Sequence, residues 1–153
     1  MGSNFKKLVK NKELANLFLD TSEEILNKLR LGKFSDAKNN QLLFLICLEN
    51  SLMHLADDTY ETFKNELNTI KDLNYKSKWH EISNVIALKN IILKELDSDG
   101  VINQIEKSKN IMFRENDENL ITRSETNDLK KFILILDKYK AFQEILRKTL
   151  YEC

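Results

Sequence analysis

The chain has 153 residues, of which 42% are hydrophobic and 31% charged, a balance typical of a folded globular protein and not of a disordered chain. Its 24 lysines and arginines equal its 24 aspartates and glutamates, and this zero net charge argues against broad electrostatic binding to nucleic acid. Proline is absent and glycine occurs only three times, which disfavours turn-rich sheet folds and favours helices. A chain of this length can bury a sizeable core without a metal or a disulfide, so we expect one domain over 1–153.

The cysteines and the N-terminal residues indicate in which cellular compartment the protein is found. Cys47 and Cys153 form no spaced metal motif, and such a pattern suits a reducing compartment. The polar, basic start lacks the apolar segment of a secretory signal, and the longest apolar run is too short to span a bilayer. We therefore expect a cytoplasmic protein with no membrane segment.

The first third of the chain predicts two helices. The first runs over about 4–19 and has an apolar face. The second begins at Thr21, because Thr21-Ser22-Glu23-Glu24 has the pattern of a capping box. Gly32 ends it, since glycine accepts the left-handed conformation that follows many helices.

The stretch 41–56, QLLFLICLENSLMHLA, is the most apolar part of the chain. Seven apolar residues follow one another over 42–48, and neither glycine nor proline interrupts them. On a helix these side chains point in every direction, so the helix must be covered on most sides. We interpret this stretch as the central helix of a bundle, capped by Ser35 and ending near Ala56.

The remaining elements follow in order. Asp57-Asp58-Thr59 predicts the cap of an amphipathic helix that reaches Ile70. One long helix is expected over 78–96, then a turn at Asp97-Ser98-Asp99-Gly100 and a further helix. A polar loop over 114–119 and a capping box at Thr122 precede the last helix, which runs to about 150. The expected fold is therefore an all-α single-domain bundle of six to seven helices around 41–56.

The residues 95–106 resemble the calcium loop of the EF-hand family. The resemblance implies that Glu95, Asp97, Asp99 and Glu106 supply ligands and that Gly100 makes the sharp turn. The stretch departs from the family pattern at its first position, where Glu95 replaces an aspartate, and no convincing second loop accompanies it. The competing interpretation is an ordinary helix-to-helix turn in which Asp99 caps the next helix.

A fainter resemblance links 88–94, LKNIILK, to HEPN-type helical ribonucleases. That family carries an arginine followed a few residues later by a histidine within one helix. Here Lys89 replaces the arginine and Lys94 stands where the histidine would be, so no acid or base for RNA cleavage is present. At most, the resemblance implies an inactive relative of such bundles.

Four apolar residues lie off the core stripes of their helices. Leu88 and Ile91 do so in the expected 78–96 helix, and Leu134 and Ile145 in the last helix. A bundle this small cannot easily surround three helices, so we expect these residues to form an exposed patch that binds a partner protein or a second copy of the chain. The alternative is that loops or a neighbouring helix cover them.

No catalytic motif emerges from the sequence. His54 and His80 have no close cysteine or histidine partner, and neither a glycine-rich phosphate loop nor an HExxH motif occurs. We therefore expect a non-enzymatic protein-interaction module, such as a small regulator, inhibitor, antitoxin or immunity-type protein, without a cofactor. The alternatives are a calcium-binding protein using 95–106 and an inactive HEPN relative.

Overall fold

A computed structural model describes residues 2–33, 37–71, 74–117 and 125–152, and side chains over 10–33, 37–71, 74–114 and 129–150. The protein is all-helical, with 84% helix and no strand in the described ranges. This confirms the all-α prediction. The elements are α1 (Gly2–Arg30), α2 (Ala37–Thr62), the 3₁₀ helix η1 (Lys64–Glu66), α3 (Tyr75–Ile82), α4 (Lys89–Leu96), α5 (Val101–Asp117) and α6 (Glu125–Glu152).

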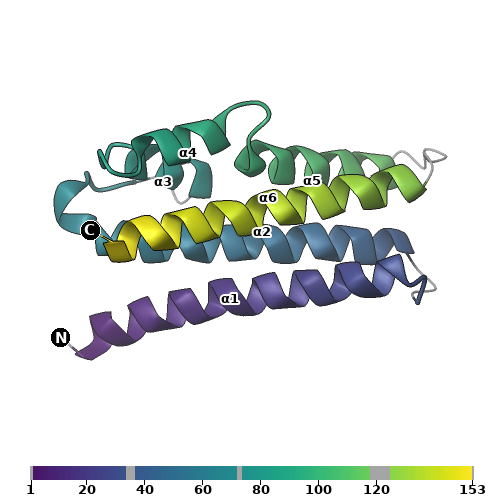
Figure 1. Cartoon of the computed structure of the whole chain (residues 1–153), viewed down its shortest axis with the longest axis horizontal. Coiled ribbons are helices and arrows are strands. Elements are labelled where there is room, and N and C mark those ends of the chain that lie inside the picture. Colours follow the sequence, from purple (N-terminus) through teal and green to yellow (C-terminus); the bar gives the residue numbers. More distant parts are fainter. Residues whose placement is uncertain (1, 34–36, 72–73, 118–124, 153) are drawn as a thin grey trace.

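The long helices α1, α2 and α6 run lengthwise through the molecule (Figure 1). α1 packs along α2, and α2 also contacts α3 and α5. α6 lies between α1 on one side and α4 and α5 on the other (Figure 1). No helix in the described parts carries an apolar stretch long enough to cross a bilayer.

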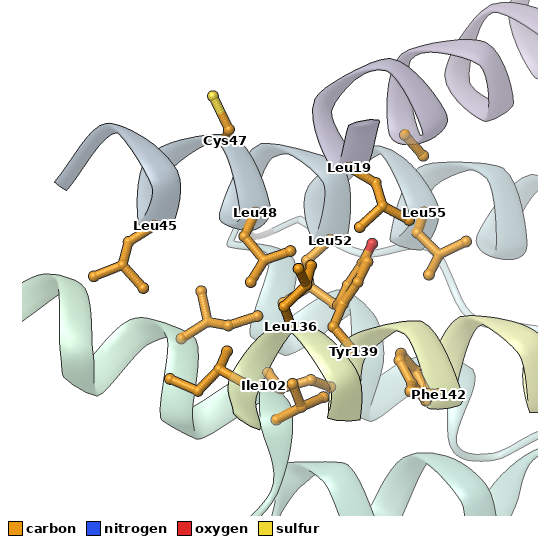
Figure 2. Packing of buried hydrophobic residues seen from close by; sticks show 14 of the residues in the cluster. Leu19, Leu45, Cys47, Leu48, Leu52, Leu55, Ile102, Leu136, Tyr139 and Phe142 are labelled. Carbon is orange, nitrogen blue, oxygen red and sulfur yellow. The ribbon is translucent and has the colours of Figure 1, made fainter. Parts of the chain in front are cut away.

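The core forms where α2 faces α5 and α6 (Figure 2). Leu48 and Leu52 of α2 are fully buried, as are Ile102 of α5 and Tyr139 of α6. Burying this apolar surface is the main driving force for the packing of these helices. The stretch 41–56 is not enclosed on every side, because Leu43 and Met53 remain 44% and 38% exposed.

The helix break expected at Thr21 is absent, so the predicted capping box is wrong. α1 passes through this point without interruption. The Thr21 hydroxyl donates to the Leu17 carbonyl (2.8 Å) and the Ser22 hydroxyl to the Leu19 carbonyl (2.7 Å). Both hydroxyls therefore bond back to the preceding turn instead of capping a new one.

The cap expected at 57–59 is wrong for the same reason. Thr59 donates its hydroxyl to the Leu55 carbonyl (2.8 Å), and α2 continues to Thr62. The helix expected to reach Ile70 is replaced by η1 and an extended segment that begins at Leu67. Asn68 anchors this segment, because its carbonyl accepts from the Tyr60 hydroxyl (2.7 Å).

The single helix expected over 78–96 is divided into α3 and α4. Asn74 caps α3, since its side chain accepts from the backbone N–H of Lys76 (2.9 Å). Between the helices, backbone N–H groups bond to carbonyls three residues earlier. Buried residues recur at every third position there, which matches the 3₁₀ period and not the α period. These residues are Trp79, Ile82, Val85 and Leu88.

The turn over 97–100 is present as predicted. The Gly100 N–H donates to the Asp97 carbonyl (2.8 Å), and α5 begins at the next residue. α5 extends to Asp117, so 114–117 is helical and not loop. The rest of the expected loop, Thr122 and Ser35 lie outside the described residues.

Candidate functional site

A groove of about 730 Å³ lies between α4, the 97–100 turn and α6. Its apolar lining comes from the side of α4 that carries Ile91 and from one face of α6. Charged side chains from both helices and from the turn surround this lining. The groove residues are Asn90, Ile91, Lys94, Glu95, Asp97, Ser98, Asp99, Gly100, Lys138, Ala141, Phe142 and Ile145.

The four residues expected to bind a partner are only partly brought together. Ile91 and Ile145 line the groove from opposite helices, with Ile91 partly buried and Ile145 49% exposed. Leu134, 55% exposed, lies eleven residues before Ile145, about three helical turns away on the same face of α6. Leu88 is fully buried and cannot belong to an exposed patch, because the 3₁₀ turns before α4 direct it into the core.

The groove also contains residues that the apolar pattern of the sequence does not predict. Lys138 and Ala141 of α6 line it, and Phe142 contributes a buried ring. The sequence does contain a pattern that predicts this face of α6. Its residues recur at steps of four, three and four, at Leu134, Lys138, Ala141 and Ile145. Such steps place side chains on one helix face. Apolar periodicity alone does not reveal this second face, because Lys138 and Ala141 lie between the two large apolar residues.

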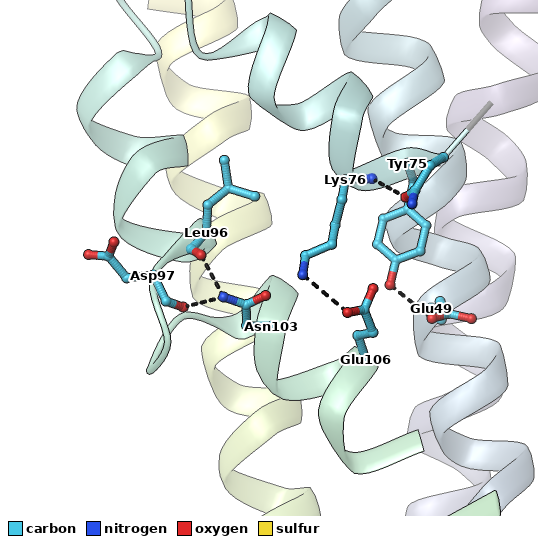
Figure 3. Close-up of polar contacts among 8 residues, drawn as sticks. Glu49, Tyr75, Lys76, Leu96, Asp97, Asn103 and Glu106 are labelled. Atoms are coloured by element: carbon cyan, nitrogen blue, oxygen red, sulfur yellow. Dashed lines mark hydrogen bonds and ion pairs between the residues drawn. The ribbon is translucent and has the colours of Figure 1, made fainter. Parts of the chain in front are cut away.

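At the turn, α4 and α5 cap each other. The Asn103 side chain of α5 donates to the carbonyls of Leu96 (2.6 Å) and Asp97 (2.9 Å) at the end of α4 (Figure 3). Burial raises the pKa of the Glu95 carboxyl, while the backbone N–H of Val101 at the start of α5 opposes this rise. Each helix therefore supplies a side chain that bonds to the backbone of the other, and these contacts stabilise the α4–α5 junction.

The four expected calcium ligands are not gathered around one point. Glu95 lies within α4, where the Val101 N–H engages it, and Asp97 and Asp99 are exposed. The Glu106 carboxylate instead accepts from the Lys76 ammonium at 3.1 Å (Figure 3). Across the described ranges, no group of three or more His, Cys, Asp or Glu side chains is arranged to hold a metal ion.

A polar cluster beside the turn joins α2, α3 and α5. Glu49 accepts from the Tyr75 hydroxyl (2.9 Å) and the Lys109 ammonium (2.5 Å), and the Lys76–Glu106 pair lies nearby (Figure 3). Burial and the adjacent Glu49 carboxylate raise the pKa of Tyr75 above its usual value, so this hydroxyl stays protonated. Each carboxylate is matched by a lysine, and these contacts connect α3 to α2 and α5.

His54, His80 and Cys47 lie in different surroundings within the described part of the chain. The His54 ring stacks on Phe18 with centroids 5.6 Å apart, and its Nδ1 lies 3.2 Å from the Asn11 amide oxygen. His80 is exposed on α3, outside the 88–94 stretch that resembles the ribonuclease motif. Burial raises the pKa of the Cys47 thiol, which disfavours the reactive thiolate.

No protein-family model, curated protein or solved structure matches this chain.

Proposed function

We propose that this protein is a non-enzymatic interaction module that binds another protein through the groove between α4 and α6. The supporting observation is that Ile91, Ala141 and Ile145 line a groove of about 730 Å³ from two different helices. A recess of this size accommodates large apolar side chains of a partner, which are the usual energetic centre of protein interfaces.

The charges around the groove suit specific recognition. Lys94 and Lys138 lie on its two helical walls, whereas Asp97 and Asp99 lie at the turn. A partner that opposes each group with the other charge binds in one orientation, while a mismatched partner leaves a charge unpaired. We infer a cytoplasmic regulator or inhibitor that acts by occupying its partner, and we treat the chain as one domain.

The proposal is tested by comparing partner capture by the wild type and by Ile145→Glu. A carboxylate at this position places a charge in the apolar lining, so capture should fall at least about tenfold. Leu17→Glu is the matched control, because Leu17 is likewise an exposed aliphatic residue (57%) but lies on α1, away from the groove. Its capture should equal that of the wild type.

Two further measurements complete this test. Light scattering shows whether the captured partner is a second copy of the chain, in which case Ile145→Glu should be monomeric. Circular dichroism shows whether the variant is folded. If Ile145→Glu unfolds, or if it binds as tightly as Leu17→Glu, the groove is not the interface.

A further inference from the structure

A second recess lies between α1, α2 and α6, on a different face of α6 from the groove. Its volume is about 430 Å³, and Ala15, Leu55, Leu146 and Leu150 supply an aliphatic lining. Asn16 of α1 accepts from the Gln143 side chain of α6 at 3.2 Å and so bridges two of its walls. We call this recess the three-helix cleft.

Asp58 places a carboxylate in the three-helix cleft without a direct partner. Among the described residues, its side chain accepts no hydrogen bond and forms no ion pair, although it is partly buried. Its neighbour Asp57 differs, because it pairs with the Lys78 ammonium. Burial raises the pKa of Asp58, and the positive charge of Lys12, which also lines the cleft, opposes this rise without forming an ion pair with Asp58.

A partly buried carboxylate without a hydrogen-bond partner loses part of its hydration, and this loss destabilises the folded protein unless another group compensates for it. The groups around Asp58 suit a particular ligand. A primary ammonium donates up to three hydrogen bonds, and its alkyl chain can lie against leucines. An anion is less suitable, because it would lie beside the Asp58 and Glu144 carboxylates, and Arg147 already binds Glu144 through two contacts of 2.9 Å.

We propose that the three-helix cleft binds an alkylammonium group, with the ammonium on Asp58 and the aliphatic chain against Leu55, Leu146 and Leu150. The group can belong to a free aliphatic amine or to a lysine side chain of a protein, since both present the same chemistry. This site is independent of the groove between α4 and α6, and neither proposal requires the other.

The test is an NMR titration of the ¹⁵N-labelled full chain with n-hexylammonium, and n-hexanol is the uncharged control of equal length. We expect saturable shift changes around 55, 58 and 146 with the amine. Binding of the alcohol, and binding of the amine to Asp58→Asn, should each be at least about tenfold weaker, because a charge-assisted hydrogen bond is lost. Equal binding of amine and alcohol, unchanged affinity in Asp58→Asn, or no saturable change with the amine would each overturn the proposal.

Nα-acetyl-lysine methylamide distinguishes the two sources of the ammonium. Tighter binding of this compound than of n-hexylammonium indicates a lysine side chain as the natural ligand. The reverse order indicates a free amine. Binding of both compounds should weaken as the pH falls and Asp58 becomes protonated, and a binding constant that does not change with pH would contradict the assignment to this carboxylate.

Thermal melting provides a readout that separates binding from folding. The raised pKa means that the charged Asp58 destabilises the fold above that pKa, and this penalty disappears as the carboxyl protonates at lower pH. Asp58→Asn should therefore melt no lower than the wild type at neutral pH, and any advantage should shrink on acidification. n-Hexylammonium should raise the melting temperature of the wild type alone.

Discussion

Ser51 shows how one buried hydroxyl connects three helices. It lies on α2, donates to the Ala15 carbonyl of α1 (2.6 Å) and lies 2.7 Å from the Tyr139 hydroxyl of α6. Because its own proton is directed to Ala15, the Tyr139 hydroxyl is the donor between the two. Both side chains are fully buried, so neither can use water as a substitute.

Ser51→Ala should lower the free energy of unfolding by about 1–3 kcal/mol, because it leaves the buried Tyr139 hydroxyl without an acceptor. Tyr139→Phe should cost less, about 1 kcal/mol, since Ser51 keeps its bond to Ala15. Urea denaturation of both variants measures the difference. A larger loss in Tyr139→Phe than in Ser51→Ala would show that the donor and acceptor are assigned the wrong way round.

The α4–α5 junction depends on a close approach of two backbones. A Cβ atom at Gly100 would lie 2.2 Å from the Glu95 carbonyl oxygen, a distance at which the backbone must move. Gly32, after α1, has a φ of 66° and open space where a Cβ atom would lie, so an alanine there meets only backbone strain.

Gly100→Ala should therefore cost about 2–4 kcal/mol, because α4 and α5 must separate. Gly32→Ala should cost only about 1 kcal/mol, the usual penalty for a left-handed non-glycine residue. Chemical denaturation of the two variants provides the comparison. Equal losses would show that the close contact with Glu95 is relieved at little cost.

Calcium should leave the stability of the whole molecule unchanged. Glu106 is held by Lys76, and Glu95 is engaged at the start of α5, so a calcium ion finds no assembled ligand set in 95–106. The melting temperature should stay the same when millimolar calcium is added, because a ligand that binds only the folded state would raise it. A clear rise that is lost in both Asp97→Ala and Glu106→Ala would restore the calcium-loop interpretation.

Part of the candidate groove followed from the sequence. Ile91, Leu134 and Ile145 were selected because they lie off the expected core stripes, and each keeps some exposed surface. Leu88 also lies off the expected stripe but is fully buried, whereas Ile86, two residues earlier, is 92% exposed. The pairing of Ile91 with Ile145 required the packing of α4 on α6, which no local pattern encodes.

The sequence by itself determined the helical class, the apolar stretch that became the core of α2 and the turn at Gly100. Missing prolines, hydrophobic content and a glycine that follows two aspartates act through local physics, so they can be interpreted without the fold. The tertiary structure decided where helices end. A threonine hydroxyl can cap a new helix or bond back to the preceding turn, and these alternatives differ by only about 1 kcal/mol. Burial of the adjoining leucines outweighs that difference, so α1 passes through Thr21 and α2 through Asp58. The continuation of α2 is also what places the Asp58 carboxylate in the three-helix cleft.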